Sequence, residues 1–418
     1  MKGSEATELG RVVGDALKGT ARRTGQASAA VIDLGYRAAR RMTRPSKRAR
    51  VDRVRAAHLN ATERAARKIG TGLQAMGRTA GRVGSRLVDG RPVVEEHAAH
   101  QWVSVLNGVY GDRLNERRSP LSLPMSLRAD GRDVPATADG MRAAYPAATG
   151  LVVVFVHGLV ETDAWWDIRS ERNWRRPGES YSGKLRAGGT WTPVQVRYNT
   201  GLRVSDNGRR LDALLEGLVA GWPVPVRSLV LVGHSMGGLV LHSALAQAGP
   251  SSGWSALVRV TVTLGTPHQG AALVRGVARL SPALAKVPET RWLAEVIASR
   301  PPGIGDLGHG NLLADDWRDL DPASLTAVAG VVPLATGVRH CVVIGTVPSK
   351  RDGLLADWVG DLLVRPGDAR PATQRGSVED KDVRVVGGAS HLDLLNHPAV
   401  YLHLTDWLAY AARQSADG

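Results

Sequence analysis

Short apolar runs alternate with helical patterns over most of this 418-residue chain. The runs have strand length and begin after turn residues; they cover 151–158, 192–201, 228–235, 258–267, 339–348 and 383–388. Helical spacing of apolar residues predicts helices over 100–114, 207–222 and 397–413, and Asp130-Gly131 is a turn signal. Strands that alternate with helices in this way predict an α/β fold, with a mostly parallel sheet covered by helices on both faces.

The pattern also predicts how the chain is divided. Residues 1–95 are rich in Ala, Arg, Gly and Thr and contain only weak helical spacing, so we expect a basic extension that is helical or partly disordered. Residues 96–418 carry the strand and helix alternation and form the α/β domain. Within it, residues 272–336 are too long for a simple crossover and are a candidate helical cap.

Charge is concentrated in the extension. Residues 1–90 contain 20 Lys and Arg against 7 Asp and Glu, so +13 of the net charge of +15 lies there. Such asymmetry indicates either contact with an anionic partner or a solvating extension, and both interpretations stay open. Because no nucleic-acid-binding motif accompanies the charge, we expect an anionic membrane surface rather than nucleic acid.

Cysteine content and hydropathy limit the class further. The single Cys341 excludes an intramolecular disulfide and a cysteine-based zinc site, and its apolar context predicts a buried strand residue. The chain opens on no signal-peptide pattern and contains no apolar run of about 18 residues, so we expect a cytoplasmic protein with peripheral membrane contact through the extension. Composition does not indicate an oligomeric state.

The strongest chemical signal is Gly233-His234-Ser235-Met236-Gly237. An apolar strand pattern precedes this G-x-S-x-G motif and a helical pattern follows it, which is the context of a nucleophile elbow. A serine on such a tight turn needs small neighbours, and the following helix places a positive dipole end beside it. We therefore predict Ser235 as a nucleophile.

Acyl transfer by a serine also needs a base, an acid that orients the base, and donors for the oxyanion. His391 follows the last predicted strand and is the expected base, whereas His157 and His234 belong to glycine turns and position backbone. The acid is expected between Ser235 and His391 in chain order; Asp361 is preferred because an apolar segment follows it, and Asp352 is the alternative.

Backbone amides after two strands complete the predicted site. The N–H of Met236 follows the nucleophile, and the N–H of Leu159 follows the strand that ends at His157-Gly158. Both lie where oxyanion donors are found in this architecture.

These motifs together resemble a known superfamily. The segments VFVHGL, RYNTG, GHSMGG, LGTPHQG, GDLLV and ASHLDLLNHP occur in the order typical of α/β-hydrolases. The chain is most similar to bacterial serine lipases and esterases, including the GPI inositol-deacylase-like branch, over about residues 150–410. The resemblance implies an α/β-hydrolase fold and a triad of Ser235, Asp361 and His391, with Leu159 and Met236 at the oxyanion hole. GDLLV departs from the commoner Gly-Asp-Gly version around the acid.

Further residues are candidates for the substrate pocket. Trp165 and Trp166 follow the oxyanion turn, and His268 follows another strand end, so each can line an acyl pocket or instead pack as an ordinary loop or turn residue. No phosphate-binding loop and no metal-ligand spacing occurs, so we expect neither cofactor nor metal.

Three functions fit this pattern. The first is a carboxylic ester hydrolase that acts on lipid or small acyl esters. The second is an acyltransferase that uses the same acyl-enzyme, and the third is a non-catalytic, membrane-associated lipid-binding module. Because all three triad positions are filled, we favour the hydrolase.

Overall fold

The computed structural model describes residues 97–176, 179–270, 302–318, 332–346, 361, 364, 366–371 and 378–415. Its contacts divide the chain into two units, Met1–Val103 and Ser104–Gly418. The division falls a few residues after the predicted boundary at 95. The extension over 1–95 and most of the candidate cap over 272–336 lie outside the described residues.

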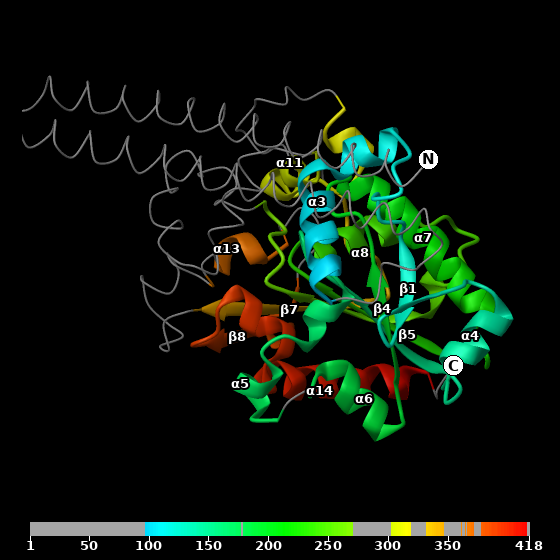
Figure 1. Ribbon diagram of the computed structural model, residues 1–418. Coiled ribbons are helices and arrows are strands. Elements are labelled where there is room, and N and C mark those ends of the chain that lie inside the picture. Colours follow the sequence, from blue (N-terminus) through cyan, green and yellow to red (C-terminus); the bar gives the residue numbers. More distant parts are fainter. Residues whose placement is uncertain are drawn as a thin grey trace, which may run out of the picture. The chain divides into compact units, whose positions relative to one another are not determined.

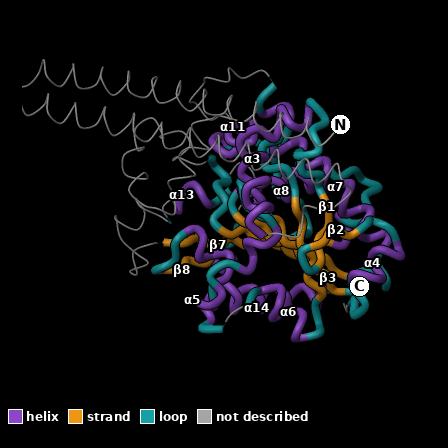
Figure 2. The backbone as a smooth tube through the Cα atoms, viewed as in Figure 1, coloured by secondary structure: helices purple, strands orange, loops and turns teal. Residues whose placement is uncertain are grey.

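The second unit is built on an eight-stranded sheet in the order β2-β1-β4-β3-β5-β6-β7-β8. The strands are β1 (Ser126–Ala129), β2 (Arg132–Val134), β3 (Leu151–Val156), β4 (Thr192–Arg197), β5 (Ser228–His234), β6 (Val258–Leu264), β7 (Arg339–Thr346) and β8 (Val383–Gly387). β1 pairs antiparallel with β2 and with β4, and every other pairing is parallel. In Figure 2 the strands gather in the centre with helices on either side.

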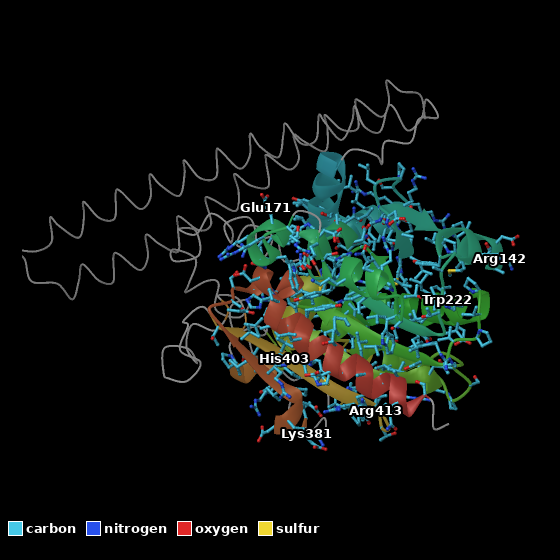
Figure 3. All side chains as sticks on the ribbon, turned by 90° about the horizontal axis from the view of Figure 1, so that it is seen from below. Arg142, Glu171, Trp222, Lys381, His403 and Arg413 are labelled. Atoms are coloured by element: carbon cyan, nitrogen blue, oxygen red, sulfur yellow. The ribbon has the colours of Figure 1, made fainter. Side chains whose placement is uncertain are left out.

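Helices cover both faces of this sheet. The longer ones are α6 (Tyr181–Gly188), α7 (Val204–Gly221), α8 (Met236–Gln247) and α14 (Pro398–Gln414). Figure 1 shows α6 and α14 below the sheet and α7 and α8 above it, and Figure 3 shows α14 from below, with His403 and Arg413 labelled. The remaining helices are α3 (His97–Glu116), α4 (Ala138–Ala144), α5 (Ser170–Trp174), α11 (Pro302–His309) and α13 (Pro366–Ala369).

Alternation along β3 explains the two layers. Val152 and Val154 pack in one buried cluster with side chains of α7 and α8, whereas Val153 and Phe155 pack in a second cluster with side chains of α6 and α14. Successive strand residues point to opposite faces, so an unbroken apolar strand needs a cover on each side. Each fully buried side chain of this kind contributes about 1.5–3 kcal/mol relative to an exposed one.

The predicted strands begin where the structure has them but end earlier. The run predicted over 151–158 ends as a strand at Val156, and the run over 192–201 ends at Arg197. In these two runs the residues left over form loops at the carboxyl edge of the sheet, and each loop contains a glycine, Gly158 or Gly201. Asp130-Gly131 is the turn of the β1–β2 hairpin, with φ of 47° and 75°, and the short strands on either side were not predicted.

Two further expectations concern single features of the described part of the chain. Cys341 lies in β7 and is 1 % exposed, so the buried strand position is confirmed, and burial raises the pKa of its thiol. Among the described residues, no helix is both long and apolar enough to cross a membrane.

Candidate active site

Ser235 occupies the tight turn between β5 and α8. Its φ of 51° and ψ of −123° lie in a region that non-glycine residues rarely adopt, and its amide donates to the carbonyl of Leu264 at 2.9 Å. Strain of this kind persists only where the surrounding structure holds it, and it is typical of functional positions. The side chain is 8 % exposed at the carboxyl edge of the sheet.

Close backbone approach explains the glycines around this turn. A Cβ on Gly237 would lie 2.2 Å from the carbonyl oxygen of Val156, and a Cβ on Gly158 would lie 2.9 Å from the Cβ of Ser235. Neither contact is sterically allowed, so glycine is required at both positions. The start of α8 therefore packs directly on the turn that follows β3.

His391 and Asp361 form a buried pair beside the elbow. Nδ1 of His391 lies 2.7 Å from Oδ2 of Asp361, and the other carboxylate oxygen accepts from the amide of Val364 at 2.8 Å. The pair lies over Gly265 at the end of β6, where a Cβ would be 3.0 Å from both atoms. The ring of His391 is 4.6 Å from that of His234, the residue before Ser235.

The environment tunes the imidazole of His391. Burial by itself lowers the pKa of His391, but the charge and hydrogen bond of Asp361, together with the charge of Glu161, outweigh it and raise the pKa above its usual value. With Nδ1 held by the carboxylate, Nε2 is the nitrogen left for a proton from another group.

The segment that carries His391 is braced from a second loop. Arg169 donates to Oγ of Ser390 at 3.0 Å and pairs with Asp393, and the amide of Ser390 donates to Asp393 at 2.9 Å. The loop between β3 and β4 thus holds the loop after β8.

Two backbone amides in the turns at this edge have no hydrogen-bond partner among the described residues. The amides on either side of Leu159 are engaged, because Gly158 donates to Glu161 at 2.6 Å and Val160 donates to Thr200 at 3.1 Å. In the described part of the chain, neither the N–H of Leu159 nor that of Met236 has a hydrogen-bond partner. An unpaired N–H is available to an anionic oxygen.

Glu161 is a residue of this site that the sequence reasoning missed. Its carboxylate is 3 % exposed and lies 2.9 Å from Nδ1 of His234, whose Nε2 lies 3.1 Å from the carbonyl oxygen of His391. Burial by itself raises the pKa of Glu161, but the charge and hydrogen bond of His234 and the Gly158 amide outweigh it, so the pKa is lowered. The only sequence signal was an acid three positions after the glycine of the oxyanion turn.

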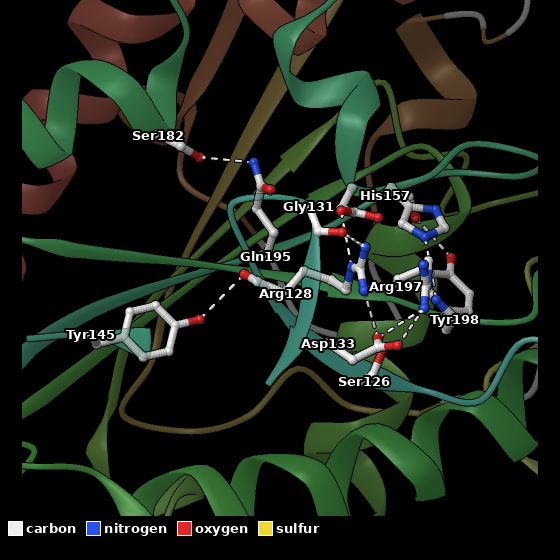
Figure 4. Close-up of polar contacts among 11 residues, drawn as sticks. Ser126, Arg128, Gly131, Asp133, Tyr145, His157, Ser182, Gln195, Arg197 and Tyr198 are labelled. Atoms are coloured by element: carbon white, nitrogen blue, oxygen red, sulfur yellow. Dashed lines mark hydrogen bonds and ion pairs between the residues drawn. The ribbon is translucent and has the colours of Figure 1, made fainter. Parts of the chain in front are cut away.

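His157 supports the turn at Gly158, and a cluster of charged side chains lies beside it. The ring of His157 bonds the carbonyl of Gly158 at 2.9 Å and accepts from the amide of Tyr198 at 3.4 Å. In Figure 4 His157 and Tyr198 lie next to a cluster of Arg128, Asp133 and Arg197. Within the cluster, Asp133 accepts hydrogen bonds from both arginines.

Arg128 extends this cluster to the loop of Glu161. Its Nε donates to Asp163 at 3.1 Å. The loop that contains Glu161 is therefore fixed at both ends, at Gly158 and at Asp163.

The predicted pocket residues lie in different places. Trp166 has no exposed surface and packs 5.0 Å from the ring of Phe155 and 6.4 Å from that of His234, whereas Trp165 is half-buried. His268 is 2 % exposed and bonds Thr263 at 3.1 Å.

His268 also lines a small pocket of about 40 Å³, and Ser235 is not among the lining residues. A role of these three side chains in substrate binding stays a prediction. The alternative acid, Asp352, lies outside the described residues.

Comparison with known proteins agrees with the fold. Residues 217–295, which include Ser235, match the model of the family described as PGAP1-like alpha/beta domain. No curated protein matches the chain. The sheet order and the strand–elbow–helix around Ser235 are those of the α/β-hydrolase fold, so the resemblance to that superfamily is confirmed at the level of the fold.

The solved structures similar to the chain include three prokaryotic proteins. The mature Bacillus licheniformis lipase BlEst2 is 18% identical, with a TM-score of 0.42, over 68% of this chain and 99% of that one. The Pyrococcus furiosus esterase Pf2001 is 17% identical, with a TM-score of 0.34, over 64% and 82%. The Legionella pneumophila phospholipase PlaB is 16% identical, with a TM-score of 0.36, over 63% and 64%.

Proposed function

We propose that this chain is a serine-dependent carboxylic ester hydrolase that acts on lipid or other acyl esters. The observation that carries the proposal is a strained serine turn that packs on the turn after β3, with an unpartnered amide in each turn, beside a buried histidine–aspartate pair. Each part has a separate task in acyl transfer, and their meeting at one edge of the sheet supports that chemistry.

Ser235 is the proposed nucleophile and His391 the proposed base. As Oγ of Ser235 bonds to the carbonyl carbon of the ester, Nε2 of His391 takes the hydroxyl proton. Asp361 holds the proton on Nδ1 and stabilises the imidazolium that forms. The leaving alcohol then takes the proton from Nε2, and an acyl-enzyme remains.

Leu159 and Met236 are the proposed oxyanion donors. In the tetrahedral intermediate the former carbonyl oxygen carries negative charge, and it accepts from both amides. One such donor contributes about 2.7–4 kcal/mol of transition-state stabilisation. Water, activated by His391, then attacks the acyl-enzyme and releases the acid and the free serine.

The test is a series of p-nitrophenyl esters of graded chain length, with fluorophosphonate labelling of the protein. We expect turnover and covalent labelling in the wild type, and neither in Ser235→Ala, whose circular dichroism should be unchanged. Labelling that persists in Ser235→Ala would show that the nucleophile is another residue. Transesterified product in place of free acid, when an alcohol is added, would indicate the acyltransferase instead.

A further inference from the structure

A buried chain of polar contacts runs beside the proposed triad without belonging to it. Glu161 accepts from the amide of Gly158 at 2.6 Å and faces Nδ1 of His234 at 2.9 Å. Nε2 of His234 in turn faces the carbonyl oxygen of His391 at 3.1 Å. Glu161 is 3 % exposed and His234 has no exposed surface.

Hydrogen-bond chemistry limits the protonation of these two residues. A neutral imidazole has one donor and one acceptor nitrogen, but both nitrogens of His234 face oxygen atoms, one of the Glu161 carboxyl group and one of a backbone carbonyl. Both contacts are satisfied when Glu161 is ionised and His234 is the imidazolium. Its counter-charge is Glu161, whose two remaining contacts, with Gly158 and with His234, are both with donors.

The pair joins three segments that the proposed reaction needs at fixed spacing. Glu161 holds the turn that presents the Leu159 amide, His234 immediately precedes Ser235, and the carbonyl that His234 binds belongs to His391. These segments follow β3, β5 and β8, so no single element keeps them together. A misplacement of about 1 Å among such groups can cost about 10²-fold in rate.

We propose that Glu161 and His234 are positioning residues, a buried carboxylate–imidazolium pair that sets the oxyanion turn, the elbow and the base relative to one another. This inference rests on the proposed function of Ser235 and His391. It assigns neither residue a contact with substrate.

The same pair has an electrostatic effect on His391. The titratable groups that act on His391 are Asp361 and Glu161, and the ring of His234 packs against it at 4.6 Å. His157 lies on the other side of Glu161 and is kept neutral by burial, which lowers its pKa. Glu161→Gln removes the charge of Glu161 together with the opposite charge of His234, so the two losses act on the pKa of His391 in opposite directions.

The first experiment does not depend on activity. In full-length protein labelled with ¹⁵N-histidine, long-range ¹H–¹⁵N spectra at neutral pH report which ring nitrogens carry protons. We expect one buried histidine with both nitrogens protonated, and we expect Glu161→Gln to convert that signal to a neutral tautomer. A neutral ring at this position in the wild type would overturn the charged pair, whether or not the protein hydrolyses esters.

The second experiment tests the positioning role. Glu161→Gln keeps an acceptor for Gly158 and a donor toward His234 but removes the charge, and Glu161→Ala removes both. We expect kcat to fall about 10-fold in Glu161→Gln and about 10²-fold in Glu161→Ala, with KM changed less than kcat. The matched control is Glu171→Gln, a carboxylate exposed on α5 and labelled in Figure 3, which should behave as the wild type.

The outcomes separate the two proposals. Unchanged kcat in a folded Glu161→Gln would reduce the pair to a structural contact and overturn the inference. Absence of ester hydrolysis in the wild type would instead refute the proposed function, and the histidine spectra would still decide whether the pair exists.

Discussion

His391 and Asp361 are joined twice, once through their side chains and once through their backbones. Nδ1 of His391 lies 2.7 Å from Oδ2, and the backbone amide of His391 donates to the carbonyl oxygen of Asp361 at 3.0 Å. One contact fixes the ring and the other fixes the backbone that carries it. The orientation of the ring is thus set by a residue 30 positions earlier in the chain.

We expect Asp361→Asn to lower kcat about 10⁴-fold, because an amide neither holds the required tautomer nor stabilises the imidazolium. The measurement is turnover of a p-nitrophenyl ester. Asp352→Asn is the control and should have a mild effect. If Asp352→Asn were the more damaging of the two, the acid would have been misassigned.

Gly237→Ala should reduce both stability and activity. The added Cβ would lie 2.2 and 2.5 Å from the carbonyl oxygens of Val156 and His157, which are backbone atoms, so the start of α8 must move. Overpacking of this kind costs about 1–3 kcal/mol, and the shift displaces the Met236 amide. Urea unfolding and ester turnover measure the two effects.

The matched control is Gly217→Ala in the middle of α7. There the nearest atom to the new Cβ is the Cβ of Ala136 at 3.6 Å, an ordinary contact. We expect this variant to gain about 0.5–1 kcal/mol, because alanine is the better helix former, and to keep full activity. Equal losses in both glycine variants would contradict the close packing of α8 on β3.

His157 should make the free energy of unfolding fall as the pH drops. Burial lowers its pKa, and the bond to Gly158 and the nearby carboxylates only partly offset this. Below about pH 6.5 the unfolded chain therefore binds a proton that the folded protein does not, and stability is lost by up to about 1.4 kcal/mol per pH unit. Urea unfolding between pH 7.5 and 5 should show a smaller fall in His157→Gln; identical slopes would exclude this contribution.

The basic extension should matter at charged surfaces only. If residues 1–95 bind anionic lipid, affinity for acidic vesicles should fall steeply with salt, since each basic residue near such a surface contributes about 1 kcal/mol and is screened. Deletion of 1–95 should lower activity on vesicle-embedded esters and leave soluble short-chain esters unaffected. Equal vesicle binding by both proteins at low salt would leave the extension without this role.

Apolar periodicity was sufficient to predict the six parallel strands, and the G-x-S-x-G motif and the need for a base after a strand then indicated Ser235 and His391. Both residues follow strand patterns directly, and parallel strands bring their carboxyl ends to one edge, so nearness in space follows from topology. Asp361 was preferred over Asp352 because an apolar segment follows it, and residues 347–360 between β7 and Asp361 lie outside the described part of the chain.

The contact between Glu161 and His234 could not be predicted from the pattern. The contact depends on the φ of 56° at Val160 and on the hydrogen bonds that hold this loop from Gly158 to Asp163. The spacing of apolar residues indicates neither feature. The antiparallel hairpin of β1 and β2 was missed for a simpler reason. Strands of four and three residues are too short for their alternation to stand out.

The bond from His234 to the carbonyl of His391 closes a loop of 157 residues. Contacts of such long range form late, because the entropy of closing the intervening chain is lost before the contact contributes anything. A refolding chain should therefore regain helix content and a buried sheet before the serine becomes reactive. The rate at which Ser235 becomes reactive toward a fluorophosphonate during refolding would then report the final docking of these segments. It would not report the earlier collapse of the chain.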